Sequence, residues 1–199
     1  MGSIEEMTQL AVTISEHLKD FGIEVVLVGG LAVSCYTDNK FLTKDIGMVD
    51  ITYSKPKTLN QAMAKLGFRK EHRHFVSDNT DIVVEFPSAP LAVGDEHIQE
   101  YDVLTTATGS LPILKAEDLI KDRLSAYFHW QDRQSLAQAL GIMLIHGVNP
   151  ISVHELVLRE ASSGEFEKLA SLHSILERAG DYSAELISNL IESEYLKSL

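Results

Sequence analysis

Segments that favour strands and segments that favour helices occupy different halves of this chain, and this separation restricts the fold more than any other feature of the sequence. Before Leu114 the apolar runs are short and rich in Val, Ile and Thr, as in EVVLV at residues 24–28. After Leu114 the apolar residues recur at helical spacing, with Gly, Pro, Asn and Asp between segments. Strands followed by helices predict an α+β domain over residues 1–114 and a helical domain over residues 115–199.

The same patterns predict individual elements. In the first half we expect helices at residues 4–21, 31–36 and 56–66, and strands at 24–28, 44–53, 68–76, 81–86, 101–107 and 111–114. Turn residues predict one hairpin around residues 77–80 and a second around Gly109. In the second half we expect helices at residues 115–127, 131–146, 152–161, 165–178 and 184–197.

The charge of the chain limits its partners. It has 199 residues and a net charge of −12, from 29 acidic residues against 17 Lys and Arg. Proteins that grip long nucleic acids neutralise many phosphates, so this balance argues against an extended nucleic-acid footprint. A small anion bound together with a metal ion stays compatible with it. No run of apolar residues reaches membrane-spanning length, and Cys35 has no second cysteine to pair with, so we expect a cytoplasmic protein.

Paired glycines follow the first predicted strand. Gly29 and Gly30 lie between the strand at residues 24–28 and a short helix. Backbone amides at the start of a helix can bind phosphate, and glycine lets a ligand approach the backbone. A plain tight turn is the alternative interpretation of the same pair.

A recognisable pattern begins at residues 43–47, Thr-Lys-Asp-Ile-Gly. A strand, Gly-Gly, a short helix and then Lys-Asp-Ile resemble the nucleotidyltransferase superfamily, in which Asp-x-Asp follows on the next strand. The chain is most similar to the minimal and abortive-infection-type nucleotidyltransferases, several of which belong to toxin–antitoxin pairs. This resemblance implies a nucleotidyltransferase-like mixed sheet with flanking helices, followed by a helical C-terminal half.

The resemblance continues further along the chain, to about Leu140. Val-Glu-Phe-Pro at residues 84–87 resembles the later strand that supplies a third carboxylate in the family. Residues 116–124 and 130–134 resemble the family's helices that face the nucleotide. By this resemblance the catalytic and Mg²⁺-binding residues are Asp45 and Glu85. The nucleotide would be bound by Gly29, Gly30, Lys44, Arg123 and Asp132.

The implied reaction is transfer of a nucleoside monophosphate from a nucleoside triphosphate to a hydroxyl. Such transfer depends on positioning and charge neutralisation, and carboxylates on one strand face can hold the metal ions. Gly47 stands where the family has its second carboxylate, so we expect impaired activity. Asp50 cannot replace it without a bulge, because it points to the opposite face of the strand from Asp45.

Several residues have a second interpretation. Asp81 lies on the same strand face as Glu85 and is the other candidate for the third acid. Lys44 suits a solvated lysine, Arg123 an ion pair with Asp132, and Asp132 the cap of the following helix. His72 and His74 resemble a metal-binding pair, but ordinary exposed histidines fit them better.

Three functions remain open. The acceptor of an active enzyme could be a protein side chain, a tRNA end or a small molecule, and a toxin-like protein would have an antitoxin partner. A catalytically inactive member would act as a nucleotide-binding or protein-interaction module. An antibiotic-type adenylyltransferase is the third possibility, and the acidic charge favours its cationic acceptors over tRNA.

Overall fold

The structure is a computed structural model and describes residues 3–93 and 96–197. The chain divides into two compact units. The first comprises Met1–Cys35 and Leu42–Lys115, and the second comprises Tyr36–Phe41 and Ala116–Leu199.

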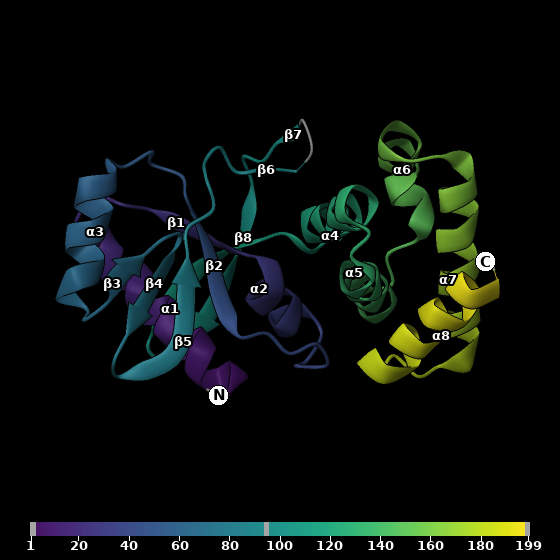
Figure 1. Cartoon of the computed structure of the whole chain (residues 1–199), viewed down its shortest axis with the longest axis horizontal. Helices are drawn as coiled ribbons and strands as arrows, with labels where there is room; N and C mark the ends of the chain where they lie inside the picture. The colour runs from purple at the N-terminus through teal and green to yellow at the C-terminus, as the bar shows by residue number, and fades with distance from the viewer. Residues whose placement is uncertain (1–2, 94–95, 198–199) are drawn as a thin grey trace. The chain divides into compact units, whose positions relative to one another are not determined.

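A seven-stranded mixed sheet forms the centre of the first unit, with the strand order β3-β4-β5-β2-β1-β9-β8 (Figure 1). Strand β1 pairs antiparallel with β2 and parallel with β9, while β2 pairs parallel with β5. The predicted α+β class with a mixed sheet is therefore confirmed. The strands are β1 (Val25–Val28), β2 (Asp45–Asp50), β3 (Arg69–Glu71), β4 (His74–Ser77), β5 (Thr80–Glu85), β8 (Tyr101–Thr106) and β9 (Gly109–Leu114).

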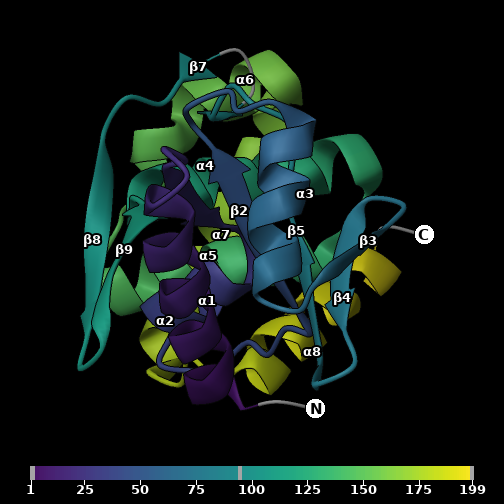
Figure 2. The same cartoon turned by 90° about the vertical axis from the view of Figure 1, so that its left-hand side faces the viewer.

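Helices α1 (Ile4–Lys19) and α3 (Pro56–Lys65) contact each other and lie over the same face of the sheet (Figure 2). A capping box between Ser3 and Glu6 starts α1, and Pro56 occupies the first turn of α3. The apolar stripe of α1, which includes Ile14 and Leu18, is buried against this face. Helix α2 (Gly29–Tyr36) begins directly after β1.

The second unit is helical, as predicted. Helix α5 (Arg133–His146) has the longest run of buried residues in this unit, because every residue from Ser135 to Leu144 is buried. Gly141 lets the ring of Phe41 pack closely against α5, and the ring of His146 hydrogen bonds to the carbonyl of Tyr36 at 2.8 Å. These two contacts explain why a short segment from before β2 belongs to this unit. The other helices are α4 (Ala116–Trp130), η1 (Pro150–Val153), α6 (His154–Glu160), α7 (Ser163–Ala179) and α8 (Ala184–Lys197).

The structure differs from the expected elements in several places. The strand predicted at residues 68–76 is two strands, β3 and β4, because His72 takes a positive φ of 55° between them and turns the chain back. A small hairpin of β6 (Ala92–Val93) and β7 (Glu96–His97) has no counterpart in the prediction. Helix α4 continues to Trp130 rather than ending at residue 127. Within the described ranges, no helix has the length and apolar character needed to cross a membrane.

Candidate functional site

The predicted acids lie on adjacent strands of the sheet. Strands β2 and β5 run parallel, with Asp45 beside Val83 and Gly47 beside Glu85. Gly47 is also the partner of Val28 at the end of β1. Since paired residues project to the same face, Glu85 and any side chain at position 47 would lie side by side, with Asp45 two residues before Gly47 on that face.

Asp45 is connected to the Gly-Gly turn through Thr43. The hydroxyl of Thr43 donates a hydrogen bond to Oδ1 of Asp45 at 2.7 Å. Gly30 packs against the same threonine, since a Cβ at position 30 would lie 2.5 Å from Oγ1 and 2.9 Å from Cβ of Thr43. Glycine at position 30 therefore lets one threonine contact the start of α2 and orient the carboxylate.

Gly29 has a different role from Gly30. Its φ of 68° lies in the left-handed region, and nothing lies within 4 Å of the position its Cβ would take. Glycine adopts this conformation at little cost, and it allows α2 to start at the end of β1 without an intervening loop. The open space leaves room for a ligand beside the backbone of the turn.

Glu85 is engaged by two basic side chains of the β3–β4 hairpin. His74 is its cross-strand partner, and Nε2 of His74 contacts Oε1 of Glu85. The Nε of Arg73 lies 3.5 Å from the same oxygen and donates to Nε2 of His74 at 3.0 Å. Glu85 remains 25% exposed and Arg73 79% exposed. A ligand that replaced these contacts would therefore have to displace one solvent-exposed arginine and one imidazole.

The donor set for a cation consists of two carboxylates. Across residues 3–93 and 96–197, no group of three or more His, Cys, Asp or Glu side chains could hold a metal ion. Asp45 and Glu85 are the carboxylates nearest Gly47 in this register, Asp81 lies four residues before Glu85 on β5, and Gly47 provides no carboxylate.

Asp50 lies on the other face of β2, as the alternation of the strand predicts. It is buried and accepts four hydrogen bonds, two from Thr52 and two from Ser54, on the loop that leads into α3. Burial alone would raise the pKa of Asp50, but the hydrogen bonds from Ser54 and Thr52 outweigh it and lower the pKa below its ordinary value. Asp50 is an ionised anchor for this loop.

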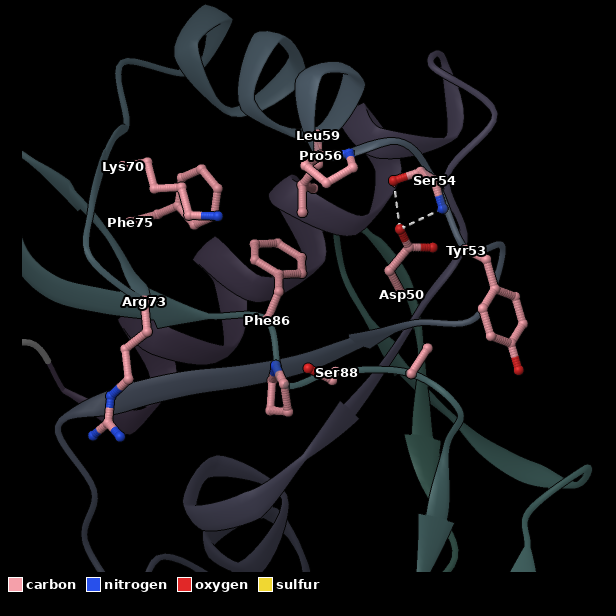
Figure 3. Close-up of a pocket in the computed structure, with 12 residues that line it drawn as sticks. Asp50, Tyr53, Ser54, Pro56, Leu59, Lys70, Arg73, Phe75, Phe86 and Ser88 are labelled. Atoms are coloured by element: carbon pink, nitrogen blue, oxygen red, sulfur yellow. Dashed lines mark hydrogen bonds between the residues drawn. The ribbon is translucent and has the colours of Figure 1, made fainter.

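A cavity of about 430 Å³ opens beside Asp50 rather than around the predicted acids (Figure 3). Its apolar wall includes Leu59 of α3, and the rings of Phe75 and Phe86 meet there edge to face. Because Asp50 and Leu59 both line it, the cavity lies on the α3 side of the sheet. Asp45 and Glu85 project from the opposite face and do not line it.

The remaining predicted residues of the first unit are solvent-facing. Lys44 and Asp81 are exposed. Asp81 precedes Val83, the partner of Asp45, and so lies further from Gly47 along β5 than Glu85 does. His72 is exposed in the β3–β4 turn, as the preferred interpretation of an ordinary exposed histidine predicts, and His72 and His74 do not share a strand face.

Arg123 and Asp132 belong to the second unit, where each has a local partner. Arg123 is half-buried, and its Nε donates to Asp122 at 2.8 Å, so its ion pair is with Asp122 and not with Asp132. Asp132 caps α5 by accepting from the backbone of Gln134 at 3.0 Å and from the hydroxyl of Ser135 at 2.7 Å. The capping interpretation of Asp132 is therefore confirmed, whereas a contact with nucleotide stays a prediction for both residues.

Three residues that contact the predicted acids were not assigned to this site from the sequence: Thr43, Arg73 and His74. Thr43 adjoins the recognised Lys-Asp-Ile pattern, so its position beside Asp45 was a usable signal. The contact of His74 with Glu85 follows from the hairpin register, which the sequence does not specify. No sequence signal distinguishes Arg73 from other exposed arginines.

Comparison with known proteins gives matches among solved structures only. A scan against protein-family models and a search of curated proteins both found no match. The chain is similar to the solution structure of the antibiotic-resistance factor ANT(2″)-Ia, with 16% identity, a TM-score of 0.40, and coverage of 92% of this chain and 90% of that one. It is also similar to the crystal structure of ANT(2″)-Ia in complex with adenylyl-2″-tobramycin, with 16% identity, a TM-score of 0.41, and coverage of 92% and 94%. Since both TM-scores are below 0.5, the function has to be inferred from the residues of the chain itself.

Proposed function

We propose that this protein binds a nucleoside triphosphate with Mg²⁺ at Gly29, Gly30, Asp45 and Glu85, and that it is a nucleotidyltransferase whose activity is weakened at Gly47. The observation that carries the proposal is the register that places Gly47 directly between Val28, at the entrance to the Gly-Gly turn, and Glu85. A phosphate-binding turn and metal-binding carboxylates then share one face at the ends of neighbouring strands.

The turn suits the phosphates. Helix α2 starts at Gly29, and its first turn contains no acidic residue that would repel an anion. Unpaired amides at a helix start favour negative charge, and the missing side chain of Gly29 lets phosphate oxygens approach the backbone of the turn. Lys44 is exposed next to Asp45 and would add a positive charge beside the triphosphate.

The two carboxylates suit a single Mg²⁺ ion. Magnesium keeps several waters and is commonly held by one or two carboxylates together with substrate phosphates. When bound, the ion would neutralise charge on the triphosphate. Thr43 fixes the orientation of Asp45 by its hydrogen bond. Glu85 has to break its contacts with His74 and Arg73 before it can bind the ion. A second Mg²⁺ ion would need a further carboxylate, and Gly47 does not provide one. We therefore expect slow nucleotidyl transfer.

A second candidate function is a nucleotide-binding module without catalysis. Gly47 favours it, because removing a carboxylate from a phosphoryl-transfer site forfeits stabilisation of the transition state. This candidate shares the binding site with the first and differs from it only in turnover. For the active enzyme, the net charge of −12 favours a cationic small molecule as acceptor over a tRNA end.

Calorimetric titration of the purified chain with each of the four ribonucleoside triphosphates, with and without Mg²⁺, tests binding. We expect at least one triphosphate to bind in a Mg²⁺-dependent manner. Absence of binding by all four would overturn both candidate functions. Transfer of radiolabel from the bound triphosphate to protein, tRNA or aminoglycoside acceptors then separates an enzyme from a binding module.

A test of nucleotide contact by Asp132 has to keep the cap of α5 intact, because loss of the cap would destabilise the helix. Asp132→Asn keeps a capping oxygen and removes the charge. If Asp132 contacts the nucleotide, this variant weakens triphosphate binding while its thermal stability stays close to that of the parent. Arg123→Lys keeps the charge near Asp122 but loses the planar guanidinium, and gives the same comparison for Arg123.

A further inference from the structure

The two edges of the seven-stranded sheet are built in opposite ways. Strand β3 forms one edge, has only three residues, and all three are charged and exposed. Its Arg69 pairs with Glu71 at 2.9 Å and with Asp78 at 2.7 Å. Short, charged edge strands discourage pairing with other chains. The β3 edge is therefore protected.

Strand β8 forms the other edge and has none of these protections. Its six residues, Tyr-Asp-Val-Leu-Thr-Thr, contain no proline, no lysine and a single charge at Asp102. Tyr101 is 36% exposed and Val103 59% exposed. The composition is that of a strand able to pair on both sides.

The backbone of β8 is regular and extended along its whole length. It pairs with β9 from Tyr101↔Leu114 to Thr106↔Gly109 without a shift of register. An antiparallel ladder uses the amides and carbonyls of alternate residues, so the other backbone groups of β8 point away from β9. In the described part of the first unit, no strand pairs with that outer side, and β8 borders the sheet in Figure 2.

We propose that the outer edge of β8 binds the β8 strand of a second copy of this chain, antiparallel and about a two-fold axis at Val103. In antiparallel pairing, opposed residues share a face of the sheet. The two-fold axis must therefore pass midway between the two copies of one residue, so that this residue lies opposite itself. With the axis at Val103, each Val103 lies opposite its counterpart and each Tyr101 lies opposite Thr105. Valine pairs and aromatic–threonine pairs across strands are favourable.

The charge of β8 selects its own copy as the occupant. In this register Asp102 lies opposite Leu104, so the single acid of one strand does not face the acid of the other. A peptide of strongly basic or acidic character would find no complementary row of charges along β8. The surface thus fits a strand that is itself nearly uncharged, and β8 is such a strand.

Sedimentation of the full-length chain over a wide concentration range tests the proposal. We expect a reversible dimer for the parent and loss of the dimer for Val103→Lys, which would place two lysines opposite each other at the axis. The matched control is Tyr53→Lys, because Tyr53 is 68% exposed and lies outside β8. A parent that stays monomeric at all concentrations, or a Val103→Lys dimer as strong as that of the parent, would overturn the proposal.

Disulfide cross-linking gives a second test that does not depend on disrupting the edge. In a Cys35→Ser background, Val103→Cys would place two thiols across the axis, where opposed Cα atoms lie within the range that a disulfide can bridge. We expect rapid formation of the covalent dimer on mild oxidation for Val103→Cys and slow formation for Tyr53→Cys. Equal rates for the two variants would contradict the predicted register.

Discussion

At the scale of single residues, position 47 is where the proposed site can be rebuilt most simply. We predict that Gly47→Asp tightens Mg²⁺-dependent triphosphate binding and raises nucleotidyl transfer by orders of magnitude, because an aspartate there would lie beside Glu85 and two residues from Asp45. A Cβ at position 47 would lie 3.3 Å from the carbonyl oxygen of Val28 and 3.5 Å from its Cγ2, so the backbone at Val28 has to shift by a few tenths of an ångström to admit the side chain. Calorimetry and radiolabel transfer measure the two effects.

The control for this variant is Gly47→Asn, which has nearly the same size and no charge. It should leave metal binding and turnover at the level of the parent. If Gly47→Asn and Gly47→Asp behave alike, steric change rather than a new metal ligand accounts for the result. The assignment of position 47 to the metal site would then be wrong.

We also predict how much Asp50 contributes to the free energy of unfolding. Asp50→Ala should lower the free energy of unfolding by about 2 kcal/mol at neutral pH, because Thr52 and Ser54 lose a charged, buried acceptor. The pKa of Asp50 is lowered in the folded state, so its contribution is present above the ordinary pKa of an aspartate, roughly 3.9, and is lost as the pH falls through the lower folded value. Urea unfolding of parent and variant should therefore give a difference that is constant near neutrality and shrinks below about pH 4.

This prediction also separates Asp50 from the proposed site. Asp50→Asn should show an intermediate loss of stability and unchanged affinity for Mg²⁺ and triphosphate. Loss of Mg²⁺-dependent binding in a folded Asp50→Asn protein would place Asp50 among the metal ligands, contrary to the strand geometry.

At the scale of elements, the turn from β1 into α2 couples the backbone to Asp45. Gly30→Ala would force a Cβ to within 2.5 Å of the Thr43 hydroxyl, so either α2 or Thr43 has to move. We expect a loss of about 1–3 kcal/mol in unfolding free energy, as for other overpacked positions, together with weaker triphosphate binding. Thr43→Ala removes the hydroxyl but keeps the Cβ at 2.9 Å, so in the Gly30→Ala background it should recover part of the lost stability but not the orientation of Asp45. Failure of the second change to recover any stability would show that Thr43 is not the obstacle.

The elements of the chain were largely predictable because their local signals agree. The apolar stripe of α1, Pro56 at the start of α3 and Asp132 before α5 each favour the element that the structure contains. The strand predicted at residues 68–76 failed at His72, where a positive φ divides it, and no glycine or proline marks that turn. The two-residue strands β6 and β7 are too short to produce a pattern.

The arrangement of the elements could be predicted only in part. Alternation along β2 gave the correct face for Asp50, because it is a local property of any strand. The order of the sheet depends on pairings between distant segments, such as Leu27 with Ile113, and the sequence does not specify them. The contacts of Glu85 with His74 and Arg73 depend on such a pairing, so the sequence predicted the acid but not its partners.

At the scale of the whole molecule, the predicted nucleotide-binding residues and the net charge bear on how a triphosphate would bind. The first unit contains the Gly-Gly turn and both carboxylates, and the predicted nucleotide contacts Arg123 and Asp132 belong to the second unit. The acidic charge of the chain would repel a free triphosphate, whereas its complex with Mg²⁺ carries less negative charge. Triphosphate binding should therefore depend steeply on the divalent cation.

Glu85 is the proposed metal ligand of the triphosphate site, and a comparison of Glu85→Ala with Asp81→Ala tests this role without changing the fold. Both residues are acids on β5, and only Glu85 lies beside Gly47. Calorimetry with the preferred triphosphate and Mg²⁺ should show binding by Asp81→Ala at the affinity of the parent and a large loss of Mg²⁺-dependent binding by Glu85→Ala. Equal affinities of both variants and the parent would contradict the claim.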